Sequence, residues 1–242
     1  MAVTPWLAHL YTASGAVTAL AAALAVQAGD YRAALFWLAT ATVIDATDGV
    51  LARALGVKER LPWFDGAKLD DLIDYLTYVF VPVLLIVQAG LVPPAWSMWI
   101  GGAVLIASGY GFSRDDAKVA ATDYFFTGFP SYWNIAALYL YVWRLAPSTN
   151  AAILMLLVAL VFVPTRYVYP SRTSTWRVAT TLLGATWALS LFVMIWRLPA
   201  VDGPWMPFSL VFPLYYLVLS ARLSAAERRP SRVASAADEA VR

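Results

Sequence analysis

Acidic side chains are concentrated in one short stretch of an otherwise apolar chain. Seven of the 15 acidic residues fall between Asp45 and Asp74. Ionised carboxylates this close repel one another, and each costs roughly 2.5–3.5 kcal/mol at the centre of a membrane. A bound cation would offset both effects. Because carboxylate oxygens are hard ligands, the stretch predicts a site for Mg²⁺ or Mn²⁺.

The spacing of these residues places them on two helix faces. At about 100° per residue, one helix presents two aspartates and two small residues on one face, with an arginine at its edge. These residues are Asp45, Asp48, Gly49, Ala52 and Arg53. The next helix presents Gly66, Asp70 and Asp74 at every fourth residue. Two antiparallel helices joined by a short loop would bring four carboxylates together, beside small residues that let a ligand approach.

Two other interpretations of the acidic cluster stay open from the residues alone. One is a buried ion-pair network, although the local positive charges are too few to neutralise four aspartates. The other is a non-catalytic, ion-coupled transporter, because intramembrane carboxylates also mark ion pathways. A pathway would spread acidic residues through the membrane, whereas the outer half holds only Asp30 and Asp202. The one-sided cluster favours a surface-facing enzyme.

The composition is that of an integral membrane protein. The 242 residues are 61% hydrophobic and 13% charged, whereas soluble domains carry roughly 25% charged residues. Spans need about 20 apolar residues, and eight segments qualify: 7–28, 33–55, 69–91, 94–112, 131–145, 150–167, 176–196 and 207–223. We expect an all-α bundle of about eight transmembrane helices. Residues 1–224 would form one membrane domain, and residues 225–242 a polar, disordered cytoplasmic tail.

Basic residues set the orientation, and rare residue types exclude other chemistry. With a cytoplasmic N-terminus, only Arg32, Arg144 and Arg197 of the 17 lysines and arginines lie outside, so both termini are expected in the cytoplasm.

The chain has no cysteine and a single histidine, His9, which excludes thiolate sites and zinc sites with several histidines. The first residues lack the basic region of a cleaved signal peptide, so we expect the N-terminus to be retained.

The two helix faces together resemble the signature of the CDP-alcohol phosphotransferase family. The chain reads Asp45-x2-Asp48-Gly49-x2-Ala52-Arg53, then twelve residues, then Gly66-x3-Asp70-x3-Asp74. This is similar to the family pattern D-x2-D-G-x2-A-R…G-x3-D-x3-D at all of its fixed positions. Most members have eight residues in the spacer, and the twelve here resemble bacterial phosphatidylcholine synthases. Segments that begin at His9, Phe125 and Tyr169 resemble the same subfamily, so the resemblance covers nearly the whole chain.

The resemblance implies a metal-dependent transferase with assigned site residues. Two Mn²⁺ or Mg²⁺ ions would be held by Asp45, Asp48, Asp70 and Asp74, and Asp74 would also be the general base. The implied substrate-binding residues are His9, Thr12, Gly49, Ala52, Arg53, Gly66, Arg166 and Arg172. No role is carried over to residues 54–65, because this spacer is longer than in most of the family.

The implied reaction joins CDP-diacylglycerol and choline to give phosphatidylcholine and CMP. The quaternary ammonium of choline has no hydrogen-bond donor, so aromatic faces are expected to bind it by cation–π attraction of about 0.5–2 kcal/mol each. The candidates are Tyr75, Tyr78, Tyr124, Tyr132 and Trp133, although such residues also gather at membrane interfaces without a ligand. Serine, glycerol phosphate or inositol phosphate stays open as the acceptor.

The location and partners follow from the same resemblance. We expect a multi-pass protein of the bacterial inner membrane, with its active site facing the cytoplasm. CDP-diacylglycerol, choline and membrane lipids are the expected partners, and no nucleic acid is expected. Related enzymes tend to be dimers, so a homodimer is an expectation from the resemblance alone.

Overall fold

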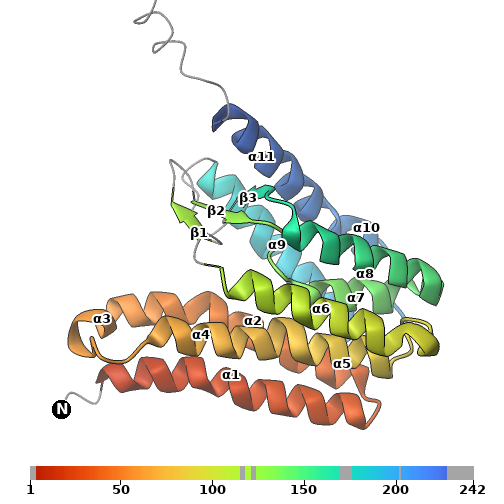
Figure 1. Ribbon diagram of the computed structural model, residues 1–242, viewed down its shortest axis with the longest axis horizontal. Helices are drawn as coiled ribbons and strands as arrows, with labels where there is room; N and C mark the ends of the chain where they lie inside the picture. The colour runs from red at the N-terminus through yellow and green to blue at the C-terminus, as the bar shows by residue number, and fades with distance from the viewer. Residues whose placement is uncertain (1–3, 115–117, 121–123, 169–175, 202, 228–242) are drawn as a thin grey trace, which may run out of the picture.

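The computed structural model describes residues 4–114, 118–120, 124–168, 176–201 and 203–227, and most of this chain is helical (Figure 1). The helices are α1 (Thr4–Gln27), α2 (Tyr31–Ala54), α3 (Val57–Arg60), α4 (Gly66–Asp74), α5 (Val81–Gln88), α6 (Ser97–Phe112), α7 (Trp133–Trp143), α8 (Pro147–Phe162), α9 (Arg177–Trp196), α10 (Trp205–Ser209) and α11 (Val211–Glu227). A π-helical segment, η1 (Tyr75–Phe80), joins α4 to α5, and a 3-10 turn, η2 (Pro94–Trp96), precedes α6.

The apolar helices make this a multi-pass membrane protein. Within the described residues, four helical stretches are long and apolar enough to cross a membrane: α1, α2, α9 and Trp205–Ala225. Each of the segments predicted from the sequence contains a helix. Large apolar side chains face outward, as on α1, where Leu10, Val17 and Leu24 are 66%, 67% and 56% exposed. Because water-facing surfaces rarely expose such stripes, this face suits lipid.

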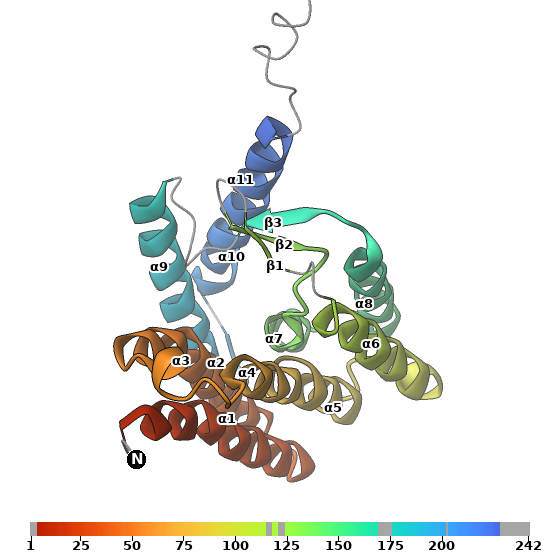
Figure 2. The ribbon, with the colours of Figure 1, turned by 60° about the vertical axis from the view of Figure 1, so that its left-hand side comes forward.

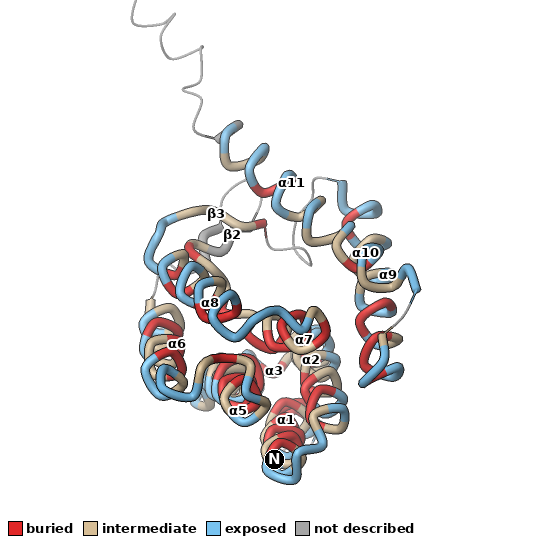
Figure 3. The backbone as a smooth tube through the Cα atoms, turned by 90° about the vertical axis from the view of Figure 1, so that its right-hand side faces the viewer, coloured by how far each residue is buried: buried red, intermediate tan, exposed pale blue. Residues whose placement is uncertain are grey.

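The helices pack around a common core with α7 near its centre. On α7, Trp133, Ala137 and Leu138 are at most 2% exposed, and Figure 3 shows α7 as a largely buried stretch among its neighbours. Helix α7 contacts α5, η1 and α2, whereas α1 packs along α2 and α4. Helices α9, α10 and α11 stand to one side of this bundle (Figure 2), and α9 contacts α2.

A small antiparallel sheet adds to the helices and corrects the purely helical expectation. Strands β1 (Lys118–Ala120), β2 (Tyr124–Thr127) and β3 (Arg166–Val168) pair in the order β1-β2-β3. Strands this short carry little sequence pattern, so they were not predicted. The segment expected to be helical up to residue 167 ends at Phe162 instead, because Pro164 disfavours a helical Val163, which is extended. Residues 166–168 then pair with β2.

Local sequence signals place the helices that carry the acidic residues. The Asp65 side chain caps α4 by accepting a 3.0 Å hydrogen bond from the Lys68 amide, and Asp30 caps α2 in the same way. Gly56, with φ at +57°, supplies the left-handed turn between α2 and α3. Pro82 has no N–H to donate four residues back, and the chain before it adopts the wider π-helical turn of η1.

Candidate metal centre and adjoining pocket

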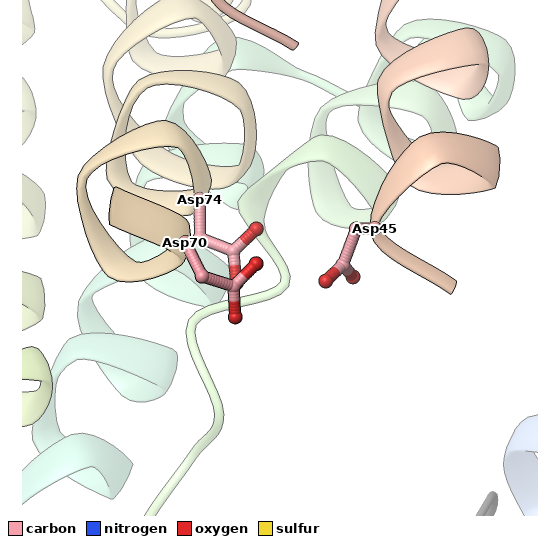
Figure 4. A group of neighbouring side chains, drawn as sticks. All are labelled: Asp45, Asp70 and Asp74. Atoms are coloured by element: carbon pink, nitrogen blue, oxygen red, sulfur yellow. The ribbon is translucent and has the colours of Figure 1, made fainter. Parts of the chain in front are cut away.

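Three carboxylates converge between α2 and α4. Asp45, Asp70 and Asp74 each offer one oxygen, and these atoms all lie within 4.8 Å of one another. Asp70 and Asp74 lie one turn apart on α4 and point toward Asp45 on α2 (Figure 4). All three residues are half-buried. Because like charges this close repel and carboxylate oxygens suit hard cations, these residues fit a divalent cation such as Mg²⁺ or Mn²⁺.

The fourth predicted ligand, Asp48, is not part of this group of three. Asp48 lies one turn farther along α2 and is 7% exposed. Its Oδ2 accepts a 2.7 Å hydrogen bond from Oγ1 of Thr12 on α1. Asp48 and Asp70 both line the pocket that adjoins the group. The structure therefore gathers three of the predicted ligands and places the fourth beside them.

A buried tyrosine orients one carboxylate of the group. Tyr78, which is 6% exposed, donates a 2.7 Å hydrogen bond from its hydroxyl to Oδ2 of Asp45. Tyr78 belongs to η1, the π-helical segment that begins directly after Asp74. Carboxylates that bind metals are commonly fixed by such outer hydrogen bonds. Tyr78 therefore fixes the position of one of the three convergent carboxylates.

A pocket of about 890 Å³ adjoins the carboxylates. Its lining residues come from α3, the N-terminal ends of α1 and α4 and the C-terminal end of α2, which gather at one end of the bundle (Figure 1). Six predicted substrate-binding residues line it: His9, Thr12, Gly49, Ala52, Arg53 and Gly66. This volume is that of a small-molecule site. The signature therefore surrounds a space large enough for a nucleotide headgroup, with Asp48 and Asp70 in its wall.

Two glycines of the signature lie against side chains of the pocket wall. A Cβ atom on Gly66 would lie 2.6 Å from Cε1 of His9, a distance that side chains essentially never show. A Cβ atom on Gly49 would lie 3.3 Å from Nη1 of Arg53. Position 66 therefore favours glycine because the His9 ring occupies the adjacent space, whereas the flexible end of Arg53 could shift to make room for a Cβ atom at position 49.

The pocket also includes residues for which no role was predicted. The segment 57–65 contributes Lys58, Glu59, Trp63 and Phe64 to the wall. This segment is most of the spacer of the signature, residues 54–65, from which nothing could be carried over. Two adjacent aromatic residues, Trp63 and Phe64, in a connection with four charged residues were the one signal that could have pointed to them.

The predicted aromatic residues fall into different environments. Tyr78 and Tyr132 lie together beside Asp45, with ring centroids 5.9 Å apart. Tyr75 instead donates its hydroxyl to the Leu105 carbonyl at 2.9 Å. Trp133 belongs to the core, where it is 0% exposed. Of these residues, Tyr78 is hydrogen-bonded to a carboxylate of the group, and Tyr132 packs against it.

The other predicted residues lie away from the pocket or outside the described part of the chain. Arg166 is in β3, opposite Thr127, and is not among the residues that line the pocket. Arg172 and the tail from residue 228 lie outside the described residues, as does the side chain of Tyr124. The structure therefore places Arg166 outside the pocket wall and does not describe Arg172 or the Tyr124 side chain.

Comparison with known proteins gives the family. No protein-family model matches the chain. The phosphatidylcholine synthase of Legionella pneumophila is 39% identical over 222 residues, which cover 89% of this chain and 86% of the relative. The phosphatidylcholine synthase of Pseudomonas aeruginosa is 37% identical over 221 residues, covering 90% and 92%. That of Rhizobium meliloti is 31% identical over 210 residues, covering 86% of each. The chain belongs to the bacterial phosphatidylcholine synthases, within the CDP-alcohol phosphotransferase family.

Proposed function

We propose that the protein transfers the phosphatidyl group of CDP-diacylglycerol to choline, forming phosphatidylcholine and releasing CMP. Membership of the family makes the chain a transferase. The observation that carries the proposal is the group Asp45, Asp70 and Asp74 at the edge of a pocket lined by the rest of the signature. A lipid substrate also accounts for the membrane setting, because its acyl chains can stay in the bilayer while its headgroup enters the site.

Two divalent cations, Mg²⁺ or Mn²⁺, are proposed to be held by Asp45, Asp48, Asp70 and Asp74. When bound, such ions neutralise the phosphate oxygens of the transferred group. The three convergent carboxylates support one ion. Asp48 and Asp70, both in the pocket wall, supply oxygens toward the second. Thr12 orients Asp48, and Tyr78 orients Asp45.

Asp74 is the proposed general base for the transfer. The choline hydroxyl oxygen attacks the phosphorus that bears diacylglycerol, the bond from this phosphorus to the CMP oxygen breaks, and the hydroxyl proton passes to Asp74. An unactivated alcohol needs such a base. Arg53 lies in the pocket wall, where its guanidinium would bind the phosphates and the charge that develops on them. Arg166 and Arg172 stay proposed contacts with a lipid phosphate.

The acceptor is proposed to lie against the aromatic pair beside Asp45. Tyr78, whose hydroxyl contacts Asp45, is buried, whereas Tyr132, which packs against it, is half-buried, so Tyr132 offers the more accessible ring face. A quaternary ammonium is attracted to such faces. This position would put the choline hydroxyl near Asp74, which shares the metal group with Asp45.

The topology is proposed to comprise eight spans with both termini in the cytoplasm. Lys58 and Glu59 on α3 and Arg53 on α2 line the pocket, and basic residues near span ends favour the cytoplasmic side. The active site would therefore face the cytoplasm across the bacterial inner membrane. Residues 1–224 form the proposed catalytic domain, with residues 225–242 as a polar tail, and a homodimer is proposed from the resemblance to related enzymes.

An alcohol-dependence assay tests the function. The purified protein in detergent is incubated with CDP-diacylglycerol, Mn²⁺ and one labelled alcohol at a time. We expect CMP release and a labelled lipid with choline and neither with serine, glycerol phosphate or inositol phosphate. CMP release with serine but not with choline would reassign the acceptor. No CMP release with any alcohol, together with ion flux across sealed vesicles, would instead favour a transporter.

A further inference from the structure

Four aromatic rings gather at the end of the pocket where α1 meets the spacer of the signature. They belong to Trp6, His9, Trp63 and Phe64, which we call the aromatic wall. The ring centroids of His9 and Phe64 are 4.4 Å apart. Trp6 lies 5.3 Å from Phe64 and 5.6 Å from Trp63. Two of the rings therefore come from α1 and two from the spacer, the segment in which this chain is longer than most of its family.

His9 carries an unused polar atom within this wall. The residue is 7% exposed, it lines the pocket, and its buried Nε2 has no hydrogen-bond partner among the described residues. Leaving a buried polar atom unsatisfied is unfavourable, and native structures usually avoid it. The ring is also confined, because Gly66 approaches Cε1 so closely that a Cβ atom would clash. The imidazole is therefore held in place while its Nε2 has no hydrogen-bond partner among the described residues.

The chemistry of the wall indicates which ligand would use that atom. Aromatic rings stack on any nucleobase, whereas a single imidazole nitrogen can distinguish the hydrogen-bonding edge of one base from that of another. A quaternary ammonium would gain from the rings but could form no hydrogen bond with Nε2. Arg53 and Asp70 line other parts of the same pocket, where they suit a diphosphate and its cation. A nucleotide therefore matches both parts of the pocket.

We infer that Trp63, Phe64 and His9 recognise the cytosine base of the substrate, the two rings by stacking and the imidazole by a hydrogen bond to the base edge. The inference rests on the proposed function and adds the residues that determine base specificity. Cytosine carries an amino donor at position 4 and an acceptor at position 3, whereas uracil carries an acceptor and a donor there. A hydrogen bond that Nε2 accepts from the 4-amino group, or one that Nε2–H donates to position 3, would therefore favour cytosine at that position.

Competition between CMP and UMP tests this inference with soluble probes. The full-length protein in detergent with Mn²⁺ is titrated with each nucleotide, and inhibition of the transfer reaction gives the two affinities. The wild-type protein should prefer CMP. His9→Phe keeps an aromatic ring but removes Nε2, so the preference for CMP over UMP should fall about tenfold. Trp63→Ala and Phe64→Ala should each lower the affinities for CMP and UMP equally, by about 5- to 100-fold.

Controls and contrary outcomes separate this inference from the proposed function. Trp99, which is 79% exposed and does not line the pocket, provides a matched control, because Trp99→Ala should change neither nucleotide affinity. An unchanged CMP preference in a His9→Phe enzyme that still makes product from choline would overturn the inference alone. A Trp63→Ala enzyme that loses affinity for CDP-diacylglycerol but not for CMP would show that Trp63 contacts the lipid or the membrane surface rather than the base. This result would also overturn the inference. A base preference that is retained in transfer to another alcohol, without choline-dependent product, would overturn only the proposed acceptor.

Discussion

Tyr78 donates a 2.7 Å hydrogen bond to Oδ2 of Asp45, and it does so from a π-helical segment that begins directly after Asp74. One irregular helical turn therefore follows one carboxylate of the metal group and carries the residue that orients another. Single π-helical turns are rare and often occur at functional sites. The geometry links the backbone of α4 and η1 to the position of a ligand on α2.

Replacing Tyr78 by phenylalanine should weaken metal binding while keeping the ring face. Outer hydrogen-bond partners of metal ligands typically contribute about 10- to 100-fold in metal affinity, so Tyr78→Phe should need about that much more Mn²⁺ for half-maximal activity. The KM for choline should stay close to that of the wild type, because the aromatic face remains. Tyr75→Phe is the matched control, since the Tyr75 hydroxyl contacts only a backbone carbonyl of α6 among its described partners. An unchanged Mn²⁺ requirement would remove Tyr78 as an orienting residue.

Asp74→Asn should stop turnover without abolishing nucleotide binding. General bases typically contribute about 10²- to 10⁴-fold, and the amide cannot accept the choline proton. We therefore expect kcat to fall by at least about 10²-fold, while CMP still binds in a titration of the purified variant. Asp71→Asn is the matched control. It also removes one carboxylate charge, but at a residue outside the group of three, so it should retain much more activity. Full activity in Asp74→Asn would disprove its role as the base.

Arg53→Ala should chiefly weaken the binding of the nucleotide-lipid. A hydrogen bond to a charged group is typically worth about 1.5–3 kcal/mol, which corresponds to roughly 10- to 100-fold in affinity. Arg53→Lys keeps the charge but loses the two-pronged contact with phosphate, so it should lie between the wild type and the alanine variant. The measurement is the KM for CDP-diacylglycerol at saturating choline. Equal KM values in all three proteins would contradict the phosphate role.

Gly66→Ala should disturb the pocket through His9. The added methyl group would lie 2.6 Å from Cε1 of His9, and overpacking of this kind typically costs about 1–3 kcal/mol. We expect a lower melting temperature and weaker CMP binding. Gly102→Ala in α6 is the control, because no atom lies within 4 Å of the position where its Cβ would be. A Gly66→Ala protein that melts and binds CMP like the wild type would show that the His9 ring can move aside.

Part of this site was predictable because its residues repeat with the period of a helix. The four-residue spacing of Gly66, Asp70 and Asp74 fixes one face of α4 whatever surrounds it, and an antiparallel partner brings Asp45 to that face. The predicted apolar segments likewise contain the observed helices, since membrane spans need long apolar stretches.

The remainder depends on contacts between distant parts of the chain. Thr12 and Asp48 are 36 positions apart, and no local pattern pairs them. The bond from Tyr78 to Asp45 depends on a π-helical turn before Pro82, and periodicity assumes a regular helix. Trp63 lies in a connection without helical or strand pattern, so its type and that of Phe64 were the only signal in the sequence, and the folded chain shows that it borders the pocket. The short sheet of β1, β2 and β3 could not be predicted from the sequence for the same reason.

The most direct test is a titration of the purified protein with Mn²⁺, followed by electron paramagnetic resonance of the free ion. If Asp45, Asp48, Asp70 and Asp74 hold the catalytic cations, the wild-type protein should bind two Mn²⁺ ions per chain, and Asp70→Asn should lose binding together with choline-dependent CMP release. A wild-type protein that is active with choline yet binds no Mn²⁺ or Mg²⁺, or an Asp70→Asn variant that binds as many ions as the wild type, would contradict the metal centre.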